Sequence, residues 1–208
     1  MMRMLRWGRA PEEVAPPDII SVDRALNTAP ELPQEDEPHP ALKGRERACL
    51  TLEAVPPILK RLRAHVHSMS ETAIAASTEE DLGLRALMGE DYEDHLAAVP
   101  AFAPKDGDAT ISLLGEKARG LRVPLDTGGD YAIAPFAITI APHGLNLEPP
   151  KGAFALHREV AETLTSLTAA LDRLDGAGLR YQKDHAFLLS RVQRLKSPET
   201  HQNGTAQP

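Results

Sequence analysis

The last third of the chain carries the most regular pattern of core-type positions. Mostly apolar residues recur there at alternating steps of four and three. These positions are Val160, Leu164, Leu167, Leu171, Leu174, Gly178, Tyr181, His185, Leu188, Val192 and Leu195. An α-helix with this spacing keeps one narrow seam of side chains pointed at a partner helix. The pattern predicts a helix over about residues 153–195, roughly 60 Å long at 1.5 Å per residue, whose seam needs a partner.

A second seam with the same spacing lies nearer the start of the chain. Its positions are Leu52, Val55, Leu59, Leu62, Val66, Met69 and Ala73. They predict a helix over about residues 50–77 that packs antiparallel against the later helix. Pro56 and Pro57 fall inside this pattern, and proline is tolerated in a first helical turn but breaks or kinks an interior. The helix therefore starts near Pro56 or bends there, and residues 182–195 of the later helix are left without a predicted partner.

A third helix is predicted over about residues 78–99. The run from Ser77 to Asp81 can cap a helix, because a capping residue is followed by acidic ones. The apolar stripe of this helix is Leu84, Met88, Tyr92, Leu96 and Val99. The residues off the stripe are expected on a solvated face. These are Arg85, Glu90, Asp91, Glu93 and Asp94.

The pattern changes period between residues 108 and 148. Residues 110–113 and 121–125 alternate between apolar and polar positions, as strands with one buried face do. The turn-forming residues 126–129 follow, and they predict a β-hairpin whose returning strand is interrupted at Pro135. Pro124 indicates an exposed edge, since proline cannot donate to a central strand. We therefore expect a small β insert between the third helix and the last one.

Composition separates this folded part from the two ends of the chain. Seven of the 18 prolines lie within residues 1–40, together with a cluster of acidic residues. Such a segment has little to bury, so residues 1–43 are predicted to be a disordered arm and residues 197–208 a disordered tail. The predicted fold class is mainly α: an antiparallel helical bundle or coiled coil with a small β-hairpin insert, forming one domain over residues 44–196.

The charge and the single cysteine exclude several classes of protein. A net charge of −7 argues against nucleic acid or an anionic membrane as the main partner. No stretch is long and apolar enough to insert into a membrane, and the first residues lack the apolar run of a cleaved signal peptide. Cys49 is the only cysteine. An internal disulfide and a thiolate zinc cluster are therefore excluded, and we expect Cys49 to make a small apolar contact.

No catalytic or metal-binding pattern is visible in the sequence. None of the eight histidines pairs with another at the four-residue helical spacing of a metal site. His185 lies on the late seam, and we expect it to hydrogen-bond across the interface and fix the register. The Gly128-Gly129 pair lacks the Lys-Ser or Lys-Thr of a phosphate loop. We predict no enzyme, no metal and no cofactor, so the candidate functional residues are those of the two seams.

The order of these elements resembles a known family. Residues 55–77 form a seam that ends in small residues, and residues 84–92 form an acidic second helix. Residues 111–115 open the β insert with a Leu-Leu-Gly sequence, and residues 164–189 form the return helix. Over about residues 50–195 this order is similar to the helical core region of bacterial flagellin. The helices that build the inner tube of a flagellin filament are not matched at either end.

The resemblance implies a flagellin-like structural or interaction protein of the bacterial flagellum. It would be an accessory subunit, or a flagellin mimic that acts in assembly or regulation, and the unmatched inner-tube helices favour the mimic. The implied partners are flagellin or flagellar assembly and regulatory proteins. The implied location is the flagellum, reached without a cleaved signal peptide, or the cytoplasm. The alternative is a coiled-coil adaptor unrelated to flagella, which binds a partner through the N-terminal arm.

Overall fold

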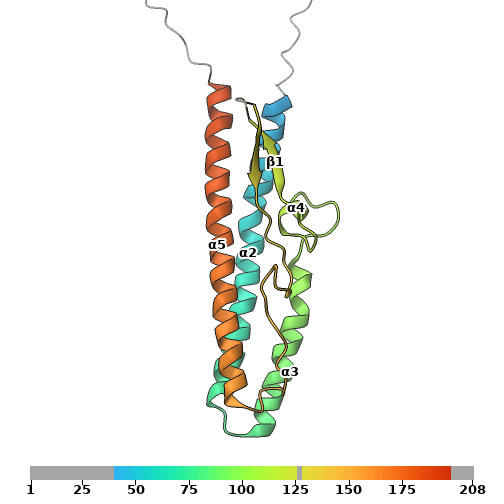
Figure 1. The fold of residues 1–208 in the computed structure, drawn as a ribbon, viewed down its shortest axis with the longest axis vertical. Coiled ribbons are helices and arrows are strands. Elements are labelled where there is room, and N and C mark those ends of the chain that lie inside the picture. The colour runs from blue at the N-terminus through green and yellow to red at the C-terminus, as the bar shows by residue number, and fades with distance from the viewer. Residues whose placement is uncertain (1–39, 126–127, 198–208) are drawn as a thin grey trace, which may run out of the picture. The chain divides into compact units, whose positions relative to one another are not determined.

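The computed structural model describes residues 40–125 and 128–197. These residues form a mainly helical fold with one antiparallel sheet of two strands, which confirms the predicted fold class (Figure 1). With the labels of Figure 1, the elements are α2 (Pro40–Thr78), α3 (Leu82–Ala98), the 3-10 helix η1 (Val99–Phe102), α4 (Ile111–Leu114), β1 (Leu121–Pro124), β2 (Asp130–Ile133) and α5 (His157–Lys196). Among the described residues, no helix has the length and apolar content needed to cross a membrane. Most of the predicted arm and tail lies outside the described ranges.

Helix α2 is longer than the sequence predicted. It begins at Pro40 rather than near residue 50, so residues 40–43 belong to a helix and not to the arm. Pro56 and Pro57 lie inside it, which excludes a helix start at Pro56. Each proline lacks the N–H that would bond to the carbonyl four residues earlier, so α2 lacks two backbone hydrogen bonds there. Buried residues on both sides, such as Val55 and Leu59, hold the helix together through this weak point.

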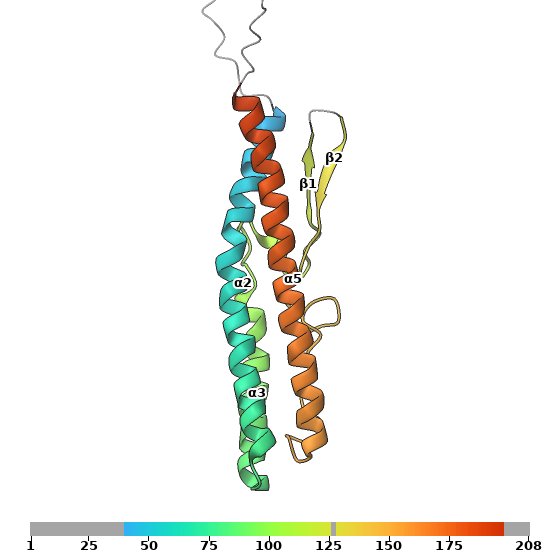
Figure 2. The same ribbon diagram turned by 90° about the vertical axis from the view of Figure 1, so that its left-hand side faces the viewer.

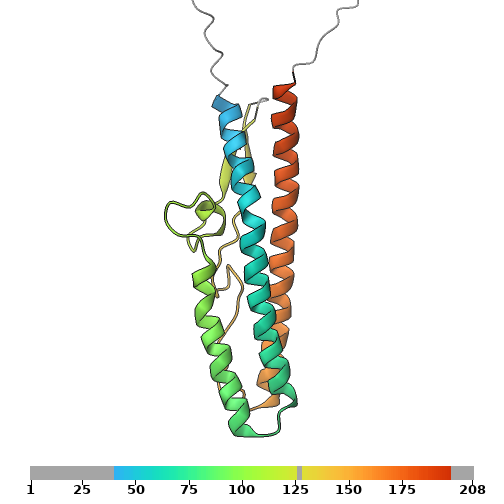
Figure 3. The same cartoon turned by 180° about the vertical axis from the view of Figure 1, so that it is seen from behind.

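Helices α2 and α5 run side by side in opposite directions (Figures 2 and 3). Three polar pairs join them: Glu46 with Lys196 at 2.6 Å, Glu53 with His185 at 3.2 Å, and Arg63 with Asp175 at 2.8 Å. As the residue number rises along α2, the number of its partner falls along α5. The expectation that residues 182–195 lack a partner is wrong, because the early start of α2 supplies one. Leu188 and Val192 are buried as a result.

Helix α3 is capped by the last residue of the predicted capping run. The Asp81 carboxylate accepts hydrogen bonds from the backbone N–H groups of Gly83 at 2.7 Å and Leu84 at 3.0 Å. The buried face of α3 differs from the predicted stripe at its start, because Leu84 is 48% exposed while Arg85 is only 5% exposed. The face continues through Gly89, Tyr92 and Leu96. The predicted placement of Arg85 on a solvated face is therefore wrong.

The β region contains one hairpin and one short helix. Strands β1 and β2 pair antiparallel, with Leu121 opposite Ile133 and Val123 opposite Tyr131. Of the predicted turn, residues 126–127 lie outside the described ranges, and Gly128 and Gly129 have positive φ values of 79° and 100°.

Residues 110–113 were predicted to form a strand, and this prediction is wrong, because Ile111–Leu114 form helix α4. Leu113 and Leu114 are both fully buried, which neighbouring residues of a half-buried strand cannot be. The returning strand ends at Ile133, before the break predicted at Pro135. Beyond it, the N–H groups of Phe136 and Ile138 donate to the carbonyls of Leu113 and Leu114 at 2.8 and 3.0 Å.

Candidate functional site: the interface between the long helices

The predicted seam of α2 is buried along its whole length. Each of its residues is at most 6% exposed, and the set is Leu52, Val55, Leu59, Leu62, Val66, Met69 and Ala73. Buried residues outside the predicted seam extend this face in both directions. They are Arg45, Ala48, Cys49 and Thr51 before the seam and Ala76 after it. The first turns of α2 do not show the helical period of apolar residues, because a cation, Arg45, occupies one of their core positions.

Six of the eleven predicted seam positions of α5 are buried, and up to Leu188 they alternate with positions that are only half-buried. The buried members are Val160, Leu167, Leu174, Tyr181, Leu188 and Val192. Between them the core takes Thr163, Ala170 and Ala177 instead of the neighbouring Leu164, Leu171 and Gly178, which are half-buried. His185 is half-buried too, and Leu195 is 43% exposed at the end of the helix. Leu164 and Leu171 give a stronger apolar signal than Thr163 and Ala170, which explains the prediction at these two positions, whereas Gly178 followed only from the regular spacing.

The polar pairs lie at the solvent edge of this interface. Both side chains of the Arg63–Asp175 pair are about half exposed, at 53% and 52%. The carboxylate holds the pKa of the Arg63 guanidinium above its ordinary value through a hydrogen bond. His185 Nε2 lies 3.2 Å from the Glu53 carboxylate. Exposed pairs of this kind contribute little free energy, with a typical range of about 0.2–1 kcal/mol, so the buried seam provides most of the stability of the helix pair.

The β-hairpin packs on the upper part of the same helix pair in Figure 1. The Tyr131 hydroxyl donates to Asp184 Oδ1 at 2.6 Å, and this hydrogen bond raises the pKa of Tyr131 to about 12. The Tyr131 ring also lies on Phe187, with 4.5 Å between ring centroids. On the other side, Arg45 Nε donates to the Pro124 carbonyl at 3.0 Å. The hairpin therefore contacts both long helices.

One buried tyrosine connects α5 to the short helix α4. The Tyr181 hydroxyl donates to the Leu113 carbonyl at 3.2 Å, and the side chain is 1% exposed. Burial raises the pKa of Tyr181 to about 12, because the phenolate would lose its hydration there. Cys49 is also buried, and burial raises the pKa of its thiol above the ordinary value. A thiol in such surroundings is a weak nucleophile.

A loop before α5 fastens the lower part of α3 to the bundle. We call residues 151–157 the clasp. Ala153 and Phe154 both have positive φ values, 46° and 60°, which is a strained backbone for residues other than glycine. Gly89 makes this arrangement fit, because a Cβ there would lie 2.8 Å from the Ala153 carbonyl carbon. The Phe154 ring packs on Tyr92, with 5.4 Å between their centroids.

The clasp also surrounds the buried guanidinium of Arg85. Arg85 Nη2 donates to the Ala155 carbonyl at 3.1 Å, and Nη1 lies 2.7 Å from His157 Nε2. Because the guanidinium can only donate, His157 Nε2 is the acceptor in this contact. No local pattern indicates this contact, because Arg85 and His157 are 72 residues apart.

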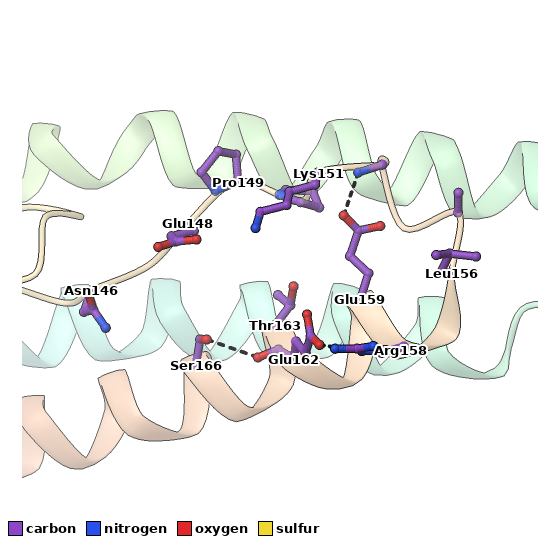
Figure 4. A pocket seen from close by; sticks show the side chains of 13 residues that line it. Asn146, Glu148, Pro149, Lys151, Leu156, Arg158, Glu159, Glu162, Thr163 and Ser166 are labelled. Carbon is purple, nitrogen blue, oxygen red and sulfur yellow. Dashed lines mark hydrogen bonds and ion pairs between the residues drawn. The ribbon is translucent and has the colours of Figure 1, made fainter.

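A surface pocket of about 640 Å³ lies between the clasp and the first turns of α5 (Figure 4). Three of its charged side chains are engaged with near neighbours: the Gly152 N–H donates to Glu159 at 2.6 Å, and Arg158 pairs with Glu162 at 2.8 Å. These contacts satisfy groups at the start of α5. Within the described ranges, no group of three potential metal-ligating side chains is present.

A second hollow of about 750 Å³ lies between α2 and α5. Pro56, Pro57, Gly178 and Leu179 contribute to its lining. Nothing within 4 Å would meet a Cβ at Gly178, so the helix surface is open there. The weak points of the two helices, prolines in one and a glycine in the other, therefore share one level of the bundle.

Comparison with known proteins gave no match, neither from a scan against models of protein families nor from a search of curated proteins.

Proposed function

We propose that this protein is a non-catalytic structural or interaction protein of the flagellin-like kind. It would act in the bacterial flagellum as an accessory subunit, or as a flagellin mimic that engages assembly or regulatory proteins. The proposal draws on the order of elements along the chain: a long helix, a capped acidic helix, a small hairpin and a long return helix. Each of these follows the order on which the resemblance to flagellin rests.

One observation carries most of the weight. The long return helix is satisfied inside its own chain, because α5 buries residues from Val160 to Val192 against the rest of the fold. A helix of this length that formed a zipper with a second chain would instead leave its seam exposed in a single copy. The internal pairing supports a preformed unit that presents its outer surface to partners. It argues against a zipper with a second chain along the α5 seam and does not bear on binding through the N-terminal arm.

The test uses purified protein with flagellin in two states. An accessory subunit is expected to sediment together with preformed flagellin filaments. A mimic is expected to bind flagellin monomers or export and regulatory proteins, and to change the rate of polymerisation. A strain without this chain should show altered filaments or altered swimming. Lack of association with monomers, filaments and export proteins, together with normal swimming, would refute both roles.

Two matched variants tie any association to the folded helix pair. Leu188→Asp places a charge in the buried interface, whereas Leu195→Asp changes an exposed residue on the same helix. Association that requires the packed unit should be lost in the first variant and kept in the second. Equal behaviour of the two variants would show that the bound segment lies elsewhere.

The adaptor alternative is tested by deleting residues 1–39, which removes the part of the predicted arm that precedes α2 and leaves α2 intact. An adaptor should lose its partner in this deletion, and a flagellin-like unit that binds through its helical part should not.

A further inference from the structure

The large exposed apolar side chains are concentrated at one end of the bundle. Nine are exposed among the described residues, and five of them belong to the end of α2, the start of α3 and the clasp. These five are Ile74, Leu82, Leu84, Leu87 and Leu156. The turn between α2 and α3 and the start of α5 lie together at this end in Figures 1 and 3. Arg85 joins the two parts, because it bonds to the carbonyl just before Leu156.

The same end carries the largest excess of acidic over basic residues in the described fold. Residues 71–94 contain eight acidic residues and one basic residue, and that basic residue, Arg85, is buried. By contrast, residues 40–70 and residues 173–196 each contain six basic and two acidic residues. We call the segment 71–94 the acidic end. Its charge is not neutralised locally: within the described part of the chain, its only ion pair joins Glu71 to His67 at 3.8 Å.

Apolar and acidic residues share one exposed line along α3. Leu84, Leu87, Asp91 and Asp94 follow one another at steps of three, four and three, which places them on one face of the helix. All four are exposed, with Leu84 at 48% and Leu87 at 57%. We call them the outer stripe of α3. Its first half is apolar and its second half is acidic.

We propose that the outer stripe of α3 is a docking surface for an amphipathic helix of another protein, one that presents apolar side chains followed by lysines or arginines. Helices recognise each other in this way when apolar residues spaced by three and four meet a matching apolar face. Opposite charges beside that face fix the orientation and raise the association rate. The partner is a basic helix because a stripe ending in Asp91 and Asp94 repels an acidic one. The inference uses only exposed side chains and charge, so it stands whether or not the flagellin-like role holds.

The probe is a synthetic helix of about five turns, labelled with a fluorophore, whose one face carries leucines over the first half and lysines over the second. A peptide of the same pattern with glutamates in place of the lysines is the control probe. Fluorescence anisotropy with the full chain should give binding for the lysine peptide and none for the glutamate peptide. Binding should weaken as salt rises from about 0.1 M to about 1 M, where the screening length falls to roughly 3 Å.

Paired variants distinguish binding at the outer stripe from nonspecific binding elsewhere on the surface. Leu84→Ser with Leu87→Ser should raise the Kd for the lysine peptide at least tenfold. The matched control is Leu50→Ser with Leu179→Ser, which changes two leucines outside the acidic end that are at least as exposed as Leu84 and Leu87 and should leave the Kd within about twofold. Far-UV circular dichroism checks that all variants keep their helix content.

The charge part has its own control. Asp91→Lys with Asp94→Lys should raise the Kd at least tenfold at low salt and much less at high salt. Glu116→Lys with Asp172→Lys makes the same change in net charge at exposed positions elsewhere and should have a small effect. Equal effects of target and control pairs would overturn the proposal. The proposal would also be overturned if sedimentation showed oligomers of the chain that dissociate when Leu84 and Leu87 are changed. The stripe would then be a contact between copies of the chain.

Discussion

The buried hydroxyl of Tyr92 allows a test of the packing between α3 and the clasp. The Tyr92 side chain is fully buried against Phe154, and within the described ranges its hydroxyl has no hydrogen-bond partner. Burying a hydroxyl without a partner costs about 1–3 kcal/mol, which phenylalanine avoids while it keeps the ring. We therefore expect Tyr92→Phe to raise the free energy of unfolding by about 1 kcal/mol.

Tyr181 provides a matched control with the opposite sign. It is buried to the same degree, but its hydroxyl donates to the Leu113 carbonyl at 3.2 Å. Removal of a satisfied hydrogen bond lowers stability by about 0.5–1.5 kcal/mol. Tyr181→Phe should therefore lower the free energy of unfolding. Urea denaturation followed by far-UV circular dichroism measures both variants on one scale.

Alkaline pH gives a second readout of the same two tyrosines. Burial raises the pKa of both Tyr92 and Tyr181 to about 12 from an ordinary value of 10.0. The folded state therefore holds the phenolic proton more tightly than the unfolded state does. The protonated tyrosines therefore make a contribution to the free energy of unfolding that is fully present below pH 10. This contribution is lost as the pH rises from 10 toward 12, by about 1.4 kcal/mol per pH unit for each tyrosine.

Each phenylalanine variant should remove one tyrosine's share of this alkaline slope. The reasoning is refuted if Tyr92→Phe and Tyr181→Phe change stability with the same sign, or if the slope stays unchanged in both variants. If Tyr92→Phe lowered the free energy of unfolding instead of raising it, a water molecule or another group would satisfy the Tyr92 hydroxyl.

Three further substitutions test other contacts. Gly89→Ala places a Cβ 2.8 Å from the Ala153 carbonyl carbon, so we expect a loss of about 1–3 kcal/mol in the free energy of unfolding and faster amide hydrogen exchange in the clasp. Leu62→Ala should cost about 2–5 kcal/mol in denaturant unfolding because Leu62 is fully buried, whereas Leu195→Ala should stay within about 0.5 kcal/mol. Pro57→Ala restores a helical N–H in α2 and should raise the melting temperature, with a gain of up to ~3 kcal/mol in the free energy of unfolding. A lower melting temperature would show that contacts of the proline ring outweigh the restored hydrogen bond.

Helical periodicity predicted the parts of the fold where large apolar residues repeat. The seam of α2 from Leu52 to Ala73 is buried at every position that the spacing named. The start of α2 was missed because its core positions include Arg45 and Thr51, which do not count as apolar in a pattern search. The predicted core of α5 is displaced by one residue at Thr163 and Ala170 for a related reason, because a larger leucine follows each of them. A small side chain can be buried without adding much to the periodic signal.

Contacts between distant segments had no signal in the sequence. Arg85 is buried because the clasp brings the Ala155 carbonyl and His157 to it, and nothing near Arg85 in the chain indicates this. Residues 110–113 were predicted to form a strand, although Ile111–Leu114 form helix α4, because four residues are too few to distinguish the helical period of 3.6 from the strand period of two. There, Asp108 Oδ1 accepts from both the N–H and the hydroxyl of Thr110, at 2.8 and 2.7 Å, and this local turn precedes α4.

The antiparallel pairing of α2 with α5 has a consequence for how fast the chain folds. Contacting residues such as Arg63 and Asp175 are 112 positions apart, and Glu53 and His185 are 132 apart. A chain must close a loop of that length before the main interface forms, and a high mean contact separation slows folding. A circular permutant that links residue 197 to residue 40 by a short flexible linker, and opens the chain at residues 79–81, would turn α5 and α2 into neighbours in sequence. Stopped-flow refolding should then be faster for the permutant than for the natural order.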